Sequence, residues 1–456
     1  MLCIKGGKLV TPAGINERDL WIDGEKIVSG EGRGGRIEVY DASGCLVFPG
    51  FIDAHTHLEM DNGVTVTADD FPSGSAAALA GGTTCILDFA TQDRGGALRD
   101  ALDRWFRLAE GRSYCDFAFH IAVTDWNPST KGELADIVRR GVTSFKVYMA
   151  YDNLRLTDEQ MLELLKATRE LGCITGVHCE LGDEVNRRVR EELSAGHMDV
   201  KYHPLSRPNE VEGRAVRRLM ELARESRSPV WVVHLSTREG LAEIRAAREK
   251  GVAVLVETCP QYLTLTEEVY IKPDFEAAKY VCSPPIRSRE DKSELWKAIK
   301  GGEVDIISTD HCSYNFAGQK ELGRTDFSKI PNGLPGVEHR PALIWTYGVC
   351  RGKITPVRMA ALLSENPARA FGIYPRKGSL EPGSDADIVI WDPQFRGTLT
   401  AVKQLQKVDY SPWEGFALEG RARAVFLRGE LCAENGRIIK GPCGRYVPRR
   451  ATWRKH

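Results

Sequence analysis

Residues 46–54 read LVFPGFIDA, and His55-Thr56-His57 follows directly. The run is apolar at almost every position, which is typical of a strand buried on both faces of a parallel sheet. Seven similar runs follow, with amphipathic helical patterns such as ALRDALDRWFRLAEG and DEQMLELLKATRELG between them. The eight runs are residues 46–54, 83–90, 116–124, 144–150, 173–178, 229–235, 252–258 and 304–309. Alternating strands and helices over roughly 260 residues predict an α/β protein with a (β/α)8 barrel of the TIM type.

The two ends of the chain have a different sequence pattern from the middle. Residues 1–48 contain short strand-like pieces, KGGKLV and DLWIDGEKIV, and residues 378–440 return to this style, with a hairpin signal at Asn435-Gly436. We therefore predict a small β-sandwich domain formed from both termini around a catalytic barrel of residues 49–377. Residues 441–456 form a basic tail, interpreted as a solvated arm or as a contact with a neighbouring subunit.

Composition excludes several classes of protein. The 456 residues include 62 Lys and Arg against 63 Asp and Glu, and this balance argues against binding to nucleic acid or to a membrane surface. No apolar run approaches the roughly 20 residues of a membrane span, and MLCIKGGKLV does not read as a signal peptide. The 12 cysteines form no CxxC pair. We expect a cytoplasmic enzyme with reduced thiols.

Side chains able to bind metal ions occur where the predicted strands end. They are His55, His57, Lys146, His178, His234 and Asp310. The carboxyl ends of barrel strands meet at one mouth, so we expect these residues to lie together. Imidazoles suit zinc, and the oxygen ligands leave manganese or another divalent ion open.

Lys146 does not fit a simple metal site. An ammonium group has donors only and cannot bind a cation. Reaction with carbon dioxide would convert it into a carbamate, whose two oxygens can bridge ions about 3.5–4 Å apart, as in two-metal hydrolytic sites. The set therefore predicts two divalent ions and carbon dioxide as cofactors.

The chain resembles the cyclic-amide hydrolases of the amidohydrolase superfamily, and within them the dihydropyrimidinase and D-hydantoinase (phenylhydantoinase) group. The stretches that carry the resemblance are PGFIDAHTHLEM with VTADDF, AGGTTCILDFA, SFKVYMAY, VHCE, VVHLST, CSPPIR, STDHCSYN, KIPNGLPGVEHR and GSLEPGSDADIVIWDP. They follow the order of the family over almost the whole chain.

The resemblance implies a role for each candidate residue. His55, His57 and Asp310 would bind the more buried ion, His178 and His234 the second ion, and Lys146 would be the bridging N6-carboxylysine. Tyr151 would donate a hydrogen bond to the developing oxyanion. The main-chain groups of Ser283 and Asn332 would hold the imide of the substrate.

The implied reaction is hydrolytic ring opening of a small cyclic ureide, either a dihydropyrimidine or a 5-substituted hydantoin, to an N-carbamoyl amino acid. A hydroxide that bridges the two ions would attack the carbonyl carbon, and Asp310 would pass its proton to the leaving ring nitrogen. Members of the group are commonly tetrameric, so a homo-oligomer, either a tetramer or a dimer, is also implied.

Three alternatives stay open. Dihydroorotase-like enzymes carry an arginine after HxH where this chain has Glu59, and allantoinase-like enzymes continue with Asn-Glu-Pro rather than LEMDNG. The third alternative is a non-catalytic scaffold related to dihydropyrimidinase, although every ligand position is filled here. Hydantoinases usually read LDMPFGG after HxH, so Asp61 and Asn62 make this loop more polar and leave the preferred substituent open.

Overall fold

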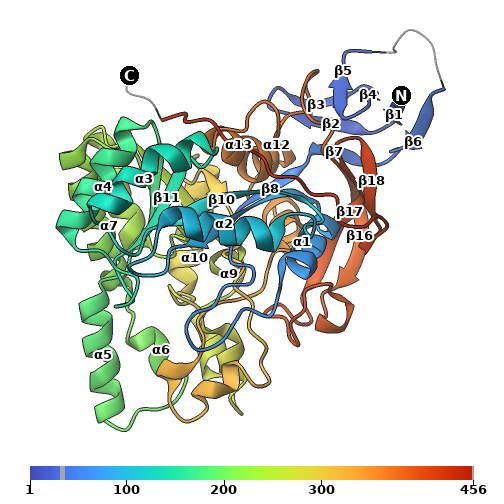
Figure 1. Cartoon of the computed structure of the whole chain (residues 1–456). Coiled ribbons are helices and arrows are strands. Elements are labelled where there is room, and N and C mark those ends of the chain that lie inside the picture. The colour runs from blue at the N-terminus through green and yellow to red at the C-terminus, as the bar shows by residue number, and fades with distance from the viewer. Residues whose placement is uncertain (31–35, 454–456) are drawn as a thin grey trace.

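The computed structural model describes residues 1–30 and 36–453 and divides them into a barrel with its helices and a β domain beside it (Figure 1). Eight parallel strands form the barrel sheet and follow one another in chain order. They are β8 (Phe51–Thr56), β9 (Thr83–Thr91), β10 (Asp116–Ala122), β11 (Ser144–Tyr148), β12 (Ile174–His178), β13 (Val230–Val232), β14 (Val254–Thr258) and β15 (Ile306–Ile307). A parallel bridge between Thr56 and His311 joins the first strand to the segment after the last. The predicted (β/α)8 barrel is confirmed.

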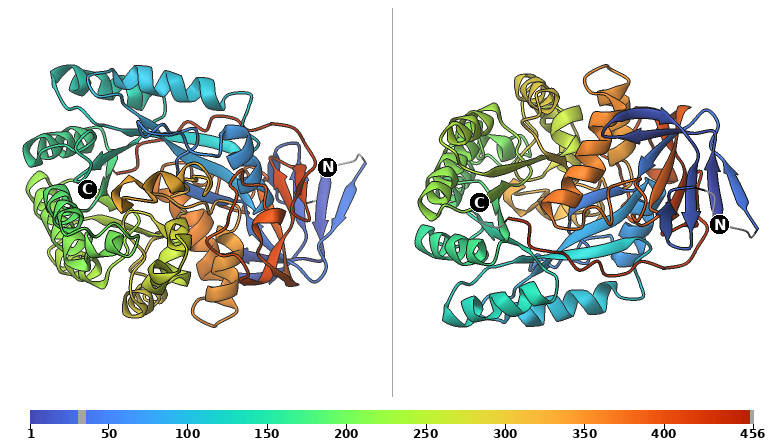
Figure 2. Two further views of the ribbon diagram at one scale, coloured as in Figure 1. Left: turned by 90° about the horizontal axis from the view of Figure 1, so that it is seen from below. Right: turned by 90° about the horizontal axis from the view of Figure 1, so that it is seen from above.

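Helices surround the barrel (Figure 2). They are α1 (Phe71–Ala80), α2 (Leu98–Ala109), α3 (Pro128–Arg139), α4 (Asp158–Glu170), α5 (Gly182–Ser194), α6 (Tyr202–Leu205), α7 (Asn209–Ser226), α8 (Arg238–Glu249), α9 (Pro260–Thr264), α10 (Arg289–Lys300), α11 (Arg340–Ile344), α12 (Pro356–Ala360) and α13 (Asn366–Ala370). Asn127, Thr157 and Ser288 begin three of them by accepting hydrogen bonds from first-turn amides. Within the described part of the chain, no helix is both long and apolar enough to span a bilayer.

Side chains fill the barrel interior and support the mouth from below. Trp231 and Phe89 are fully buried there, with ring centroids 6.2 Å apart. Gly176 makes room for the indole, because a Cβ at this position would lie 2.6 Å from Cε3 of Trp231. The interior is a packed core, as in other barrels of this type.

Strands from both ends of the chain form the β domain. One sheet has the order β19-β18-β17-β16-β7-β2-β3, and the other has the order β5-β4-β1-β6. The N-terminal strands are β1 (Leu2–Lys5), β2 (Lys8–Thr11), β3 (Gly14–Glu17), β4 (Leu20–Asp23), β5 (Lys26–Val28), β6 (Glu38–Asp41) and β7 (Leu46–Pro49). The C-terminal strands are β16 (Ile388–Thr398), β17 (Ala417–Leu427), β18 (Glu430–Glu434) and β19 (Arg437–Ile438). The predicted β domain from both termini is confirmed.

The run at residues 46–54 is not one strand, which corrects the sequence interpretation. It divides at Gly50 into β7, which pairs with β16 of the β domain, and β8, which opens the barrel. Gly50 has no room for a side chain, because a Cβ would lie 2.1 Å from Oγ1 of Thr84. Both halves are buried, so burial alone gives no sign in the sequence of the change of sheet.

The basic tail takes a place that neither sequence interpretation described. Residues 441–453 run along the barrel of their own chain, where Val447 is fully buried and donates its amide to Phe117 O. Arg449 is buried as well and donates to Ser144 Oγ at 2.6 Å. Residues 454–456 of the predicted tail lie outside the described residues. The contact with a neighbouring subunit stays a prediction.

A buried group of charges joins the barrel to the β domain. Lys377 Nζ lies 2.6 Å from Asp116, 3.2 Å from Asp385 and 2.5 Å from Asp387. Arg428 also pairs with Asp116. We call these five residues the junction cluster.

Candidate active site

Three predicted ligands meet at the mouth of the barrel. His55 and His57 lie at and just after the end of β8, and Asp310 follows β15. Asp310 Oδ1 is 3.1 Å from Nε2 of His55 and 3.2 Å from Nε2 of His57. These three ligating atoms all lie within 4.8 Å of one another, so they are placed to bind one cation.

His178 and His234 form the neighbouring pair. Nδ1 of His178 is 3.0 Å from Nε2 of His234, and the ring of His234 is 5.6 Å from the ring of His55. Two nitrogens bound to one tetrahedral zinc at about 2.0–2.1 Å would be roughly 3.3 Å apart. The observed separation fits a pair that shares a second cation next to the first.

Lys146 reaches the same place from β11. It is 1% exposed, and among residues 1–30 and 36–453 its Nζ has no hydrogen-bond or ion-pair partner. Its Nζ lies 5.3 Å from the ring of Phe89 and 5.4 Å from that of Tyr148. Burial lowers the pKa of Lys146 to about 8. Since only the neutral amine reacts with carbon dioxide, this environment favours carboxylation.

Two buried carboxylates orient the histidines from outside. Glu257 Oε1 accepts a hydrogen bond from Nδ1 of His55 at 2.8 Å. Burial opposes protonation of His55, but Glu257 and Asp310 raise its pKa to about 9, so a cation on Nε2 would displace a proton from this ring. Glu180 Oε2 accepts from Nε2 of His178 at 2.8 Å, which leaves Nδ1 of His178 free to bind metal. Such partners are what metal-binding histidines usually have behind them.

The electrostatic environment suits cation binding. Burial opposes ionisation of Asp310, but the adjacent His55 and His57 hold the pKa of this carboxyl well below its usual range. Burial lowers the pKa of His57 to about 4 and also lowers the pKa values of His178 and His234. These three imidazoles are therefore neutral near pH 7, as metal ligands must be.

The backbone at this mouth is held in an unusual conformation. Tyr151, His234 and Asp310 have φ values of 67°, 38° and 52°, in the left-handed region that disfavours side chains. Backbone strain of this kind clusters at functional sites, where the surrounding structure enforces it. β13 and β15 both end before these residues and are shorter than the apolar runs predicted.

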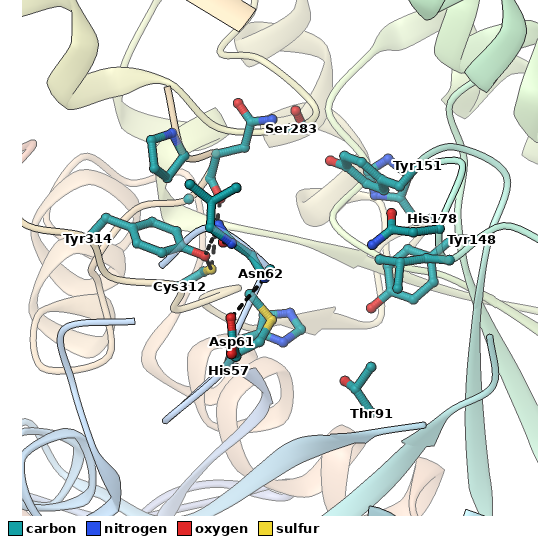
Figure 3. Close-up of a pocket in the computed structure, with 18 of the residues that line it drawn as sticks. His57, Asp61, Asn62, Thr91, Tyr148, Tyr151, His178, Ser283, Cys312 and Tyr314 are labelled. Carbon is teal, nitrogen blue, oxygen red and sulfur yellow. Dashed lines mark hydrogen bonds between the residues drawn. The ribbon is translucent and has the colours of Figure 1, made fainter. Parts of the chain in front are cut away.

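A cavity of about 840 Å³ opens above these groups. Tyr148, Tyr151 and His178 lie on one side of it, with Tyr314 and Asn62 opposite (Figure 3). The structure brings all the predicted site residues to this cavity, namely His55, His57, Lys146, Tyr151, His178, His234, Ser283, Asp310 and Asn332. Their individual roles stay predictions.

Comparison with known proteins decides the family. The model of the amidohydrolase family matches residues 46–432. The chain belongs to the amidohydrolase family. It is 42% identical to a D-hydantoinase of Geobacillus stearothermophilus, over 98% of this chain and 96% of that protein. A D-hydantoinase of Streptomyces coelicolor is 41% identical over 98% of this chain and 97% of its own.

Solved structures agree with the sequence relatives. The crystal structure of a dihydropyrimidinase from Brevibacillus agri superimposes on this amidohydrolase with a TM-score of 0.97, at 41% identity and covering 99% of each chain. The expected membership of the dihydropyrimidinase and hydantoinase group is thereby confirmed. The expectation of an enzyme is confirmed with it.

Sequence reasoning missed the residues that support the ligands of this amidohydrolase. It gave no role to Glu257 or Glu180, and it overlooked Arg207, whose Nη1 lies 2.9 Å from Glu180 Oε2. Burial alone would raise the pKa of Glu180, but Arg207 and His178 lower it to about 2, so Glu180 stays ionised behind its histidine. Glu257 at a strand end and Glu180 two residues after a ligand were the available signals; Arg207, on a loop, offered none.

Proposed function

We propose that this amidohydrolase opens the cyclic amide of dihydropyrimidines or 5-substituted hydantoins by hydrolysis, giving N-carbamoyl amino acids. The observation that carries the proposal is the meeting of four histidines, Lys146 and Asp310 beneath one large cavity. Full-length similarity to enzymes named D-hydantoinase and dihydropyrimidinase supports the cyclic ureide as substrate.

Two divalent ions fit the donor set. His55, His57 and Asp310 would hold one, His178 and His234 the other, and carboxylated Lys146 would join them. Carboxylation adds carbon dioxide to the neutral Nζ and releases one proton, which gives the lysine two anionic oxygens. When bound, the ions supply a nucleophilic hydroxide near neutral pH and polarise the carbonyl group under attack.

The chain itself holds the substrate and moves the proton. Tyr151 donates its phenol hydrogen to the carbonyl oxygen as negative charge develops there. Burial raises the pKa of Tyr151 above its ordinary value, so this donor stays protonated. Asp310 accepts the proton of the nucleophile on a carboxylate oxygen and returns it to the ring nitrogen that leaves. The main-chain groups of Ser283 and Asn332 hold the imide.

The test is kcat/KM for metal-loaded protein on dihydrouracil, phenylhydantoin, allantoin and dihydroorotate in parallel. A clear preference for either of the first two supports the proposal and names the branch. Preference for allantoin or dihydroorotate replaces it with one of the alternative cyclic amidases. Inactivity on all four compounds with both ions bound contradicts the proposal and favours a scaffold.

A further inference from the structure

Lys320 is a buried lysine without an acidic partner. It begins a short 3-10 helix, Lys320–Gly323, and its exposed fraction is 0%. Lysine is almost never fully buried unless it is paired. Within residues 1–30 and 36–453, its ammonium has no ion pair. Instead Nζ donates to three main-chain carbonyls, those of Val281 at 2.8 Å, Pro331 at 2.6 Å and Gly333 at 2.8 Å.

The three carbonyls belong to the two segments that line the cavity with the predicted imide-binding residues. Val281 lies two positions before Ser283, and Pro331 and Gly333 flank Asn332. The segments also meet directly, because the amide of Gly333 donates to Val281 O at 3.0 Å. All three donors of the ammonium are therefore spent on joining these two pieces of backbone.

Neither segment has regular secondary structure around these residues, so few ladder hydrogen bonds hold its backbone in place. Fixing the backbone of each such residue costs conformational entropy. Close contacts leave the segment at 333 little tolerance, since a Cβ on Gly333 would lie 2.4 Å from Cys312 O. An interaction that fixes both segments before substrate binds lowers the entropy that is lost on binding.

We propose that Lys320 is a positioning residue, whose ammonium fixes the Ser283 and Asn332 segments relative to each other so that their main-chain groups meet the substrate's imide together. The inference rests on the proposed function and deepens it. Lys320 does not line the cavity and touches no predicted metal ligand. Its Nζ also lies 5.8 Å from the centroid of the Tyr314 ring, which lines the cavity, but its three hydrogen bonds go to backbone carbonyls and it acts on binding through these.

Burial lowers the pKa of Lys320 to about 7, whereas the hydrogen bonds to three carbonyls favour the charged form, which is the one with three donors. A neighbouring side chain agrees with the positioning role. The preceding residue, Gln319, contacts a third segment, because its Nε2 donates to Thr65 Oγ1 and to Val66 O, each at 2.7 Å. This segment directly follows residues 60–64, which line the cavity.

The test compares Lys320→Met and Lys320→Gln with the wild type, all loaded with metal. Methionine keeps an unbranched apolar chain and removes all three donors, whereas glutamine keeps an amide donor. We expect KM for the preferred ureide to rise about 10–100-fold in Lys320→Met and less in Lys320→Gln. We expect kcat to change by less than KM and the metal content to stay at the wild-type level.

Lys279→Met is the matched control. Lys279 pairs with Glu276 at 2.6 Å in a neighbouring 3-10 helix and does not line the cavity. The KM of the Lys279→Met protein is expected to equal that of the wild type. If Lys320→Met does not fold, Lys320→Gln decides the matter by the same readouts.

Hydrogen exchange separates positioning from a merely structural role. The backbone amides beside the three carbonyls should exchange faster in the Lys320 variants, with the barrel strands unchanged; they are those of Val281, Cys282, Ser283, Asn332, Gly333 and Leu334. Faster exchange with an unchanged KM overturns the inference, as does an unchanged exchange rate. A wild type that is inactive on every ureide contradicts the proposed function instead, and the exchange experiment still reports whether Lys320 holds the two segments.

Discussion

Two buried clusters of ligating side chains in this amidohydrolase look alike and differ in charge. In the described residues, His55, His57 and Asp310 form one group and Asp116, Asp385 and Asp387 the other, each with ligating atoms within 4.8 Å of one another. The junction cluster already contains its cations, since Lys377 Nζ contacts all three of its carboxylates. At the mouth no permanent cation stands among the three ligands.

The difference shows that proximity of ligands is not enough to identify a metal site. The junction cluster is complete because Lys377 and Arg428 occupy the places that a metal ion would take, so it serves to join domains. At the mouth, the one lysine among the predicted ligands is Lys146, which has no hydrogen-bonded or ion-paired acidic partner in the described chain and whose pKa burial lowers to about 8. Buried ligating groups that have no cationic side chain paired with them favour the binding of a metal ion.

The substitution with the largest expected effect removes one of the predicted metal ligands at the mouth. Lys146→Ala should remove the bridge and nearly all turnover, by about 10³-fold or more, because the two ions lose their shared ligand. Metal analysis and kcat/KM measure the two consequences. Lys166→Ala, on the exposed face of α4, is the control and should keep both. A variant at Lys146 with two ions and wild-type turnover would contradict the carbamate assignment.

The corresponding change in the junction cluster should affect stability instead. Lys377→Met leaves three buried carboxylates short of a cation and should lower the free energy of unfolding by about 3–5 kcal/mol. Activity of the folded fraction should stay near that of the wild type. Urea unfolding and kcat report the two effects. Lys407→Met removes an exposed ion pair with Asp70 and should cost about 1 kcal/mol or less. A loss of activity at equal folded fraction would show that the two clusters are not independent.

Tyr151→Phe tests the mouth more gently. Loss of one oxyanion donor should lower kcat by about 10–10³-fold while both ions stay bound. Tyr202→Phe, whose ring stacks on His197 away from the cavity, should leave kcat unchanged. Steady-state kinetics at saturating substrate decide the matter. An unaltered rate in Tyr151→Phe would remove this residue from the reaction.

The smallest expected effect concerns acid. Asp385 bonds to Lys26 at 2.7 Å and Arg376 at 3.0 Å, and although burial opposes its ionisation, Lys377 and these partners lower its pKa to about 2. Asp385→Asn should cost about 1.5–3 kcal/mol at neutral pH. Because the folded-state pKa lies below the unfolded value of 3.8, this contribution is present above pH 4 and is lost as the pH falls towards 2.

Urea unfolding of both proteins across this pH range measures the difference. Loss of metal ions in acid affects wild type and variant alike, so it cancels from the comparison. A difference in stability that stays constant between pH 4 and pH 2 would show that Asp385 does not titrate there.

The sequence allowed the barrel to be predicted because eight apolar runs lie in order and each forms its strand locally. It could not show that the first run serves two sheets, since β7 and β8 differ in partners and not in character. The position of the C-terminal tail could not be predicted for a similar reason. Arg449 reads as a solvated charge until the fold brings Ser144 within 2.6 Å of its guanidinium.

The metal-binding residues were predictable because strand ends converge in every barrel of this type. Lys320 was not, because its partners are carbonyls, which every residue carries and which leave no mark in a sequence. Lys377 was hidden too. Its three carboxylates come from residues 116, 385 and 387, and only the meeting of barrel and β domain places them around one ammonium.

The shared sheet of the β domain also sets an order of events during synthesis. Strand β2 ends at Thr11 and β7 at Pro49, but β16, on which β7 pairs, begins only at Ile388. At about 5–20 residues per second, the ribosome needs on the order of 20–80 s to deliver it. Until then the backbone N–H and C=O groups on one edge of β7 have no partner strand and can pair with another chain. Most of the barrel is therefore synthesised before the β domain can be completed. We expect growth at low temperature with added chaperones to raise the yield of folded enzyme.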